Sequence, residues 1–278
     1  MKSTQDILVD VVNHIGMIKL NRTSSLNALS FSMIETIKNQ LSQWENDDNV
    51  YLIYISTLSQ TAFCAGGDVV DIYNHAIKGD IKYVSTFLST QYVMDYMIAT
   101  YKKPIISFAN GYVLGGGAGL VMGSKYFIAS EYAKFGMPET QIGFFPDVGA
   151  SYFLNKLPDH VGRYLGLSGE IINQHDLVYL KMANYFITNS NWDLVVEQLL
   201  TVNWVNSKID NQLKDIFNTY KEETIDSTIK KHVDKISHLF KHESLGDIIN
   251  NMSDKDSFEK KIKSKILKNS PTALTISL

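Results

Sequence analysis

Two acidic residues stand eight positions apart in a largely apolar stretch, residues 137–149 (MPETQIGFFPDVG). They are Glu139 and Asp147, and methionine, isoleucine, phenylalanine and proline surround them. A carboxylate in apolar surroundings holds its proton more tightly, and a raised pKa suits acid–base or nucleophilic work near neutral pH. Both residues also have an ordinary explanation as loop or cap residues, since Asp147 could cap a helix over 149–156.

Two further segments are rich in small residues that let a backbone approach a ligand. Residues 62–69 (AFCAGGDV) end at a position where a helix would start, and Asp68 could simply cap a strand–helix turn there. Residues 109–119 (ANGYVLGGGAG) place glycines at a helix start, where free N–H groups face an anionic or polarised oxygen. The dinucleotide pattern GxGxxG fails at Leu120 or Met122, so phosphate binding is disfavoured.

Composition and charge indicate which partners and which compartment to expect. The 278 residues are 45% hydrophobic and 20% charged, which is ordinary globular usage. The formal net charge of -3 offers no basic excess for a phosphate backbone, so we expect no nucleic-acid partner. The single cysteine, Cys64, cannot form an internal disulfide, and the N-terminus lacks signal or transit features, which together favour the cytoplasm. Residues 104–124 carry no charge, but Asn110 and the glycines indicate strand, turn and buried helix, so we expect no membrane partner.

Strand and helix signals alternate through the first two thirds of the chain. We expect strands over 7–12, 17–20, 50–55 and 105–109, and helices over about 69–78, 81–100 and 116–122. Another helix starts after the N-cap Ser30 and has on one face Met33, Ile34, Ile37, Leu41 and Trp44. This alternation predicts an α/β fold of βαβ units with a mainly parallel sheet. Glycine is rare and helical periodicity dominates after residue 200, so we expect a core over 1–190 and a helical region over 191–278.

The glycine-rich and acidic segments together resemble the crotonase (enoyl-CoA hydratase/isomerase) superfamily. The resemblance rests on Ala-Gly-Gly-Asp at 65–68, Gly-Gly-Gly at 115–117 and Pro-Glu at 138–139, and it covers about residues 7–187. It implies a ββα spiral core that binds acyl-CoA. It also implies a homo-oligomer, no metal, and no cofactor beyond the coenzyme A portion of the substrate.

The resemblance assigns roles to particular backbone groups. The thioester carbonyl would lie between the N–H groups of Gly67 and Gly116, which form the oxyanion hole. Donors aimed at a developing oxyanion contribute ~10²–10³ each to the rate. Coenzyme A would be bound, largely through backbone groups, by Ala65, Gly66, Asp68, Val69 and Val70.

The acidic positions indicate the subfamily. Hydratases of this superfamily carry a second glutamate where this chain has Gly119, so the water-adding activity lacks one of its two acids. The segments at 137–140 and 145–149 instead resemble 3-hydroxyisobutyryl-CoA hydrolases, the thioesterases of valine breakdown. The resemblance implies that Glu139 either attacks the thioester carbonyl, giving a mixed anhydride, or activates a water. Asp147 would hold the hydroxyl group of the substrate or help to handle the proton.

Two alternatives stay open. One is a different crotonase-type activity (hydratase, isomerase, decarboxylase or dehalogenase), and the other is a crotonase-fold protein that binds coenzyme A without turnover. His238 and His242 are four residues apart on a predicted helix, but no third ligand is apparent, so a solvated helix face is favoured over a metal site. Cys64 lacks a recognisable partner and is interpreted as a packing residue.

The last ten residues begin like a helix, with Ser270 as N-cap and Pro271 at the first helical position. They stop while Leu274, Ile276 and Leu278 are still apolar, and no glycine ends the helix. We therefore expect a truncated helical region that exposes an apolar surface, promotes self-association and reduces turnover.

Overall fold

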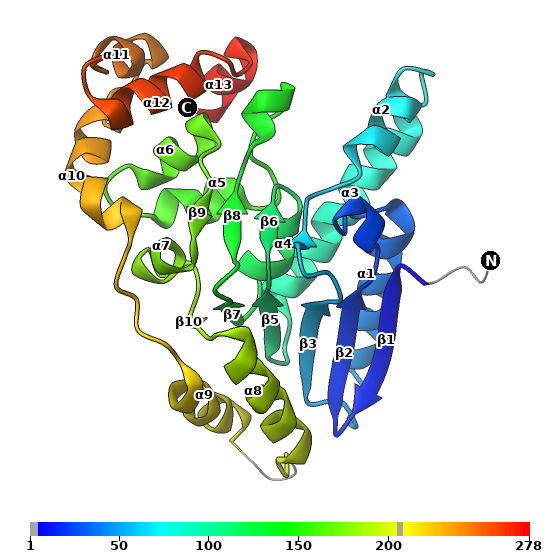
Figure 1. The fold of residues 1–278 in the computed structure, drawn as a ribbon. Helices are drawn as coiled ribbons and strands as arrows, with labels where there is room; N and C mark the ends of the chain where they lie inside the picture. Colours follow the sequence, from blue (N-terminus) through cyan, green and yellow to red (C-terminus); the bar gives the residue numbers. More distant parts are fainter. Residues whose placement is uncertain (1–4, 205–207) are drawn as a thin grey trace.

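The computed structural model describes residues 5–204 and 208–278, in which two β-sheets are surrounded by helices (Figure 1). The larger sheet has the order β1-β2-β3-β5-β7-β10, and the smaller has the order β4-β6-β8-β9. The strands of the larger sheet are β1 (Ile7–Val12), β2 (Ile15–Leu20), β3 (Leu52–Thr57), β5 (Ile105–Ala109), β7 (Tyr126–Ala129) and β10 (Tyr185–Phe186). Those of the smaller sheet are β4 (Ala62–Cys64), β6 (Tyr112–Leu114), β8 (Lys134–Gly136) and β9 (Ile172–Asn173). Only β1–β2 and β8–β9 pair antiparallel.

Successive strands alternate between the two sheets, which gives the ββα spiral that was predicted. In the pairs β3–β4, β5–β6 and β7–β8, the first strand joins the larger sheet and the second joins the smaller one. The mainly parallel pairing that was predicted is present, but the strands divide between two sheets. The turn between β5 and β6 explains it: Gly111 has φ +89, and a Cβ there would lie 2.2 Å from the Thr61 carbonyl oxygen. Only glycine allows so tight a change of direction.

The helices of the core include those predicted after Ser30 and over 69–78, 81–100 and 116–122. They are α1 (Phe31–Glu45), α2 (Val69–Ala76), α3 (Ile81–Thr100), α4 (Gly117–Met122), α5 (Ala150–Phe153), α6 (Val161–Ser168) and α7 (Gln174–Tyr179), with short 3-10 helices η1 (Thr23–Ser25), η2 (Glu139–Ile142) and η3 (Leu154–Lys156). The Ser30 hydroxyl caps α1, and the five residues predicted for one face of this helix are its buried residues. Residues 104–124 form β5, β6 and α4. Within the described ranges, no helix is long and apolar enough to cross a membrane.

The C-terminal region is helical, as predicted, and packs on the core in two places (Figure 1). Its helices are α8 (Asn189–Thr201), α9 (Ile209–Tyr220), α10 (Thr228–Phe240), α11 (Leu245–Asn250), α12 (Ser257–Ile266) and α13 (Pro271–Ser277). α8 and α9 cover the larger sheet, where Trp192 stacks on Phe108 at 4.3 Å. α10, α12 and α13 pack against α6.

The final helix differs from its expected unpacked state. The Ser270 hydroxyl caps α13 and Pro271 occupies its first turn, as predicted. Ala273 and Leu274 are buried in this helix, whereas Ile276 is 63% exposed. The exposed apolar surface expected at this segment is thus reduced, because one face of α13 packs on α6 and η2.

Candidate active site

The predicted oxyanion glycines lie side by side. β4 and β6 are parallel neighbours, so the loops that follow them meet at one edge of the smaller sheet. A Cβ built on Gly116 would lie 2.9 Å from the Gly67 amide nitrogen, and one built on Gly66 would lie 3.5 Å from the Gly116 nitrogen. Among the described residues, neither the Gly67 nor the Gly116 amide donates a hydrogen bond to a protein group. Two free donors this close together can stabilise one oxyanion.

Gln91 of α3 borders these amides and was missed by the sequence analysis. It is 2% exposed. A Cβ on Gly116 would come within 2.5 Å of its Nε2, and one on Gly67 within 3.4 Å of its Oε1. The buried face of α3 contains only two polar residues, Gln91 and Asp95, among Phe87, Met94 and Ile98. Polar residues four apart on an otherwise apolar helix face were the signal that could have identified them.

Glu139 begins η2 and lies against the glycine loop. A Cβ on Gly115 would come within 2.7 Å of its Oε1, and Gly115 has φ +48, so this position requires glycine for both space and conformation. Glu139 is 6% exposed, and its Oε2 has no hydrogen-bond partner among the described residues. Burial raises the pKa of Glu139 to about 8, and the charge of Asp147 adds to the rise. The carboxyl group is therefore close to its titration point at physiological pH.

The turn that carries Glu139 is fixed by the C-terminal region. The Ser270 amide donates to the Thr140 carbonyl at 2.9 Å. The Asn269 side chain donates to Thr140 Oγ1 at 3.0 Å and to the Leu167 carbonyl at 2.9 Å. These bonds are buried, so they hold η2 firmly, and the region after residue 190 helps to position an acid that the sequence analysis assigned to the core alone.

Asp147 follows the Phe-Pro turn and faces α3. Its Oδ2 accepts a hydrogen bond from the Tyr92 hydroxyl at 2.8 Å. Burial raises the pKa of Asp147, and the Tyr92 hydrogen bond opposes that rise. The alternative interpretation as a helix cap is not supported, because the N-cap of α5 is Gly149 and no side chain caps this helix. Tyr92 is a second α3 residue that sequence reasoning missed.

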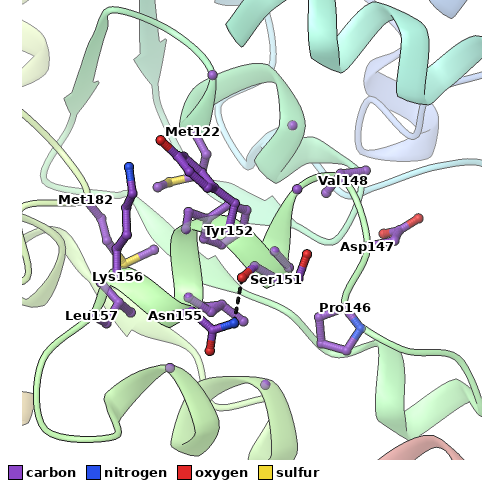
Figure 2. Close-up of a pocket in the computed structure, with 18 of the residues that line it drawn as sticks. Met122, Pro146, Asp147, Val148, Ser151, Tyr152, Asn155, Lys156, Leu157 and Met182 are labelled. Atoms are coloured by element: carbon purple, nitrogen blue, oxygen red, sulfur yellow. Dashed lines mark hydrogen bonds between the residues drawn. The ribbon is translucent and has the colours of Figure 1, made fainter. Parts of the chain in front are cut away.

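A cavity of about 1250 Å³ opens on the Asp147 side of the site. Its lining includes Asp147, Asp95 and Gly119, and it extends to the end of α13. Figure 2 shows Asp147 at one side of this cavity, apart from the cluster of Met122 and Tyr152. Glu139 and the two oxyanion glycines do not line it. The cavity therefore reaches Asp147 and Asp95 but not Glu139 or the two glycines.

The predicted coenzyme A segment lies at the start of α2. Asp68 caps this helix by accepting from the Asp71 amide at 3.1 Å, and it pairs with Arg22 at 2.8 Å. The capping role anticipated for Asp68 is thus present, and its carboxylate is occupied. The Ala65 amide donates to the Leu26 carbonyl at 3.0 Å, and the Gly66 carbonyl accepts from Leu29 at 2.8 Å, so part of the segment's backbone is also occupied. Val69 and Val70 are exposed, beside the oxyanion loop.

The remaining candidate residues, Cys64, His238 and His242, are not part of this site. Burial raises the pKa of the Cys64 thiol to about 12, so it is not a nucleophile near neutral pH. α10 ends at Phe240, so His242 lies beyond the helix that holds His238, and the two do not share one helical face. In the part of the chain that the structure describes, no group of three or more His, Cys, Asp or Glu side chains could hold a metal ion.

Replacing Tyr92 tests its link to Asp147. We expect Tyr92→Phe to lower kcat/KM of any reaction that uses the Asp147 carboxylate roughly 10- to 100-fold, because a hydrogen bond to a charged group contributes about 1.5–3 kcal/mol. The loss should be accompanied by a higher apparent pKa for Asp147 in the pH–rate profile, since the bond favours its ionised form. Tyr132→Phe, at an exposed position outside the lining of the cavity, is the control. Superimposable profiles for the two variants would show that the Tyr92 hydroxyl has no catalytic effect.

Comparison with known proteins identifies the family of the chain. The enoyl-CoA hydratase/isomerase family profile matches residues 15–278. The chain is 35% identical to the mitochondrial 3-hydroxyisobutyryl-CoA hydrolase of Xenopus tropicalis, over 94% of this chain and 69% of that protein. It is 34% identical to the chicken (Gallus gallus) protein of the same name, over 99% of this chain and 72% of the other.

The fold also matches solved structures. A crystal structure of a carnitinyl-CoA dehydratase from Mycobacterium thermoresistibile superimposes with a TM-score of 0.91 at 28% identity, and the match covers 99% of this chain and 78% of that one. Family profile, curated relatives and fold therefore agree, and the chain belongs to the enoyl-CoA hydratase/isomerase family.

Proposed function

We propose that this chain is an acyl-CoA thioesterase that acts on a short, branched 3-hydroxyacyl-CoA such as 3-hydroxyisobutyryl-CoA. The observation that carries the proposal is the Glu139 carboxyl group, buried and with an unpartnered oxygen, beside the glycine loop that bears the Gly116 amide. Relatives named 3-hydroxyisobutyryl-CoA hydrolase support the choice of substrate. At the coarser level, family membership supports a crotonase-type acyl-CoA enzyme.

The proposed reaction is acyl transfer to water. In the general-base route, ionised Glu139 takes a proton from water while the water oxygen bonds to the thioester carbon. The carbonyl oxygen gains negative charge and accepts hydrogen bonds from the amides of Gly67 and Gly116. The carbon–sulfur bond then breaks, and the thiolate leaves and takes up a proton.

In the nucleophilic route, the Glu139 carboxylate bonds to the same carbon and expels the thiolate. Water then hydrolyses the mixed anhydride and restores the carboxylate. Both routes need the same ionised group under the same two donors. Asp147, hydrogen-bonded to Tyr92, is within electrostatic range of Glu139 and would assist proton handling.

A panel of acyl-CoA substrates tests the proposal. The protein is incubated with 3-hydroxyisobutyryl-CoA, isobutyryl-CoA and crotonyl-CoA while free thiol and enoyl absorbance are followed. We expect catalytic thiol release from the first compound at a rate well above enoyl loss from crotonyl-CoA. Enoyl loss without thiol would favour a hydratase, and saturable binding without any product would favour a non-catalytic coenzyme A-binding protein.

The resemblance also leads us to propose a homo-oligomer. Light scattering on the full chain measures the mass directly, and a monodisperse species near 31.4 kDa would contradict this proposal.

A further inference from the structure

Asp95 is a buried acid that the proposed reaction does not use. Its side chain projects from α3 and is 8% exposed. Neither Oδ1 nor Oδ2 has a hydrogen-bond partner among the described residues. Buried polar atoms in folded proteins are nearly always paired, and an unpaired carboxyl group is costly to bury. Both oxygens of one buried side chain being unpartnered therefore points to a ligand group.

The position of Asp95 relative to α4 indicates which ligand group that is. A Cβ built on Gly119 would lie 2.3 Å from Asp95 Oδ1 and 2.5 Å from its Cγ, so glycine at 119 is what leaves room for the carboxyl group. Gly119 lies three residues beyond Gly116 in the sequence, which is roughly 4.5 Å further along a helix. The Asp95 carboxyl group therefore lies beyond the Gly67 and Gly116 amides, in the direction in which α4 runs.

The cavity indicates that Asp95 lies on the acyl side of the Gly67 and Gly116 amides. Asp95, Gly119 and Asp147 line the same cavity, whereas residues 65–70, assigned to coenzyme A, do not line it. An acyl chain whose carbonyl oxygen meets the Gly67 and Gly116 amides would bring its second and third carbons toward Asp95. Gly119 stands where hydratases carry their second glutamate. The carboxyl group of Asp95, from the neighbouring helix α3, occupies that space.

We propose that Asp95 determines specificity by hydrogen-bonding the hydroxyl group on carbon 3 of the acyl chain. This inference rests on the proposed function and deepens it. A hydroxyl group can donate to one oxygen of a protonated carboxyl group and accept from the O–H of the other, so it satisfies both unpartnered atoms. An acyl group without the hydroxyl leaves the acid unpaired, and a site built to hydrogen-bond a substrate hydroxyl rejects the analogue that lacks it.

The electrostatic surroundings of Asp95 support this role. Burial raises the pKa of Asp95 well above its ordinary range, and the charge of Asp147 adds to the rise. A protonated carboxyl group can donate as well as accept, which suits a neutral hydroxyl ligand. Asp147 accepts a hydrogen bond from Tyr92, and we assign the substrate hydroxyl to Asp95 and proton handling to Asp147.

The test is the ratio of kcat/KM for 3-hydroxyisobutyryl-CoA to that for isobutyryl-CoA, measured by thiol release. We expect Asp95→Leu, which keeps the branching of the side chain but is apolar, to lower the ratio at least ~10-fold by losing activity on the hydroxylated substrate. Asp95→Asn keeps hydrogen-bonding groups and should hold the ratio within about threefold of the original protein. An unchanged ratio in Asp95→Leu would overturn the inference.

A second set of variants guards against simple misfolding. Gly119→Ala should push the Asp95 carboxyl group aside and lower the same ratio, because its Cβ would overlap Oδ1. Adding Asp95→Ala to Gly119→Ala removes the overlap, so thermal stability should recover while the ratio stays low. Recovery of the ratio in the double variant would contradict the role of Asp95.

Failure of the proposed function remains distinguishable from failure of this inference. If no compound releases thiol, the thioesterase proposal fails, and the same ratio is then taken from dissociation constants measured by calorimetry. A preference for the hydroxylated compound that Asp95→Leu abolishes would still support the hydroxyl subsite. Equal affinities for the two compounds in the original protein would overturn it.

Discussion

Glu139→Gln should lower the rate of thioester hydrolysis at least ~10²-fold while it makes the protein more stable. The rate falls because glutamine keeps the shape of the side chain but can neither accept the proton from water nor form the mixed anhydride. Coenzyme A binding should persist, since the segment assigned to it is separate from η2. Thiol release and calorimetric binding measure the two effects.

The stability gain follows from the raised pKa of Glu139. The unfolded chain loses this proton near pH 4.5, whereas the folded protein keeps it until about pH 8. Stability is therefore full below the lower value and declines as the pH rises toward the upper one. At pH 7 glutamine avoids this penalty, and we expect a gain of about 1–3 kcal/mol in the free energy of unfolding.

Glu35→Gln, at an exposed position on α1, is the control and should change neither quantity. Turnover of Glu139→Gln equal to that of the original protein would remove Glu139 from the mechanism. Loss of turnover together with lower stability would indicate a structural role instead.

Gly116→Ala should reduce turnover by ~10²–10³, the range seen when one oxyanion donor is lost. The added Cβ would lie 2.5 Å from Gln91 Nε2 and 2.9 Å from the Gly67 amide nitrogen, in the space between the two donors. Gly67→Ala should be milder, because its Cβ meets nothing closer than 3.4 Å, an ordinary contact with Gln91.

Gly246→Ala on α11 controls for the general effect of adding a methyl group, since its nearest neighbour would be 3.9 Å away. Circular dichroism and thermal unfolding establish that each variant is folded. A Gly116→Ala protein that hydrolyses thioesters as fast as Gly246→Ala would mean that the carbonyl oxygen binds elsewhere.

Local signals in the sequence predicted much of the fold. The five buried residues of α1, the bounds of α3 and β5, and the Ser270 cap of α13 all follow from periodicity and capping, which depend on neighbouring residues. The ββα spiral over two sheets was predicted from the family resemblance alone, and no local signal indicates it. It depends on turns such as the one at Gly111, whose conformation is set by contact with the distant Thr61.

The residues of the candidate site were also only partly predictable from local sequence. The glycines and the two acids of the motifs could be identified because each motif is a short run of sequence. Gln91, Tyr92 and Asp95 could not, since their proximity to the motifs depends on how α3 packs across the sheet edge. Asn269 lies still further along the chain, 129 residues from the Thr140 hydroxyl that it contacts. No local pattern indicates such a pair.

The pH dependence of thiol release from 3-hydroxyisobutyryl-CoA tests most directly whether Glu139 is the group that starts the reaction. Both routes require its ionised form, and burial raises the pKa of Glu139 to about 8. We therefore predict that kcat/KM is low at pH 6, rises through a midpoint near pH 8 and levels off above it. Release that does not depend on pH between 6 and 9, or that is absent throughout this range, would contradict the account.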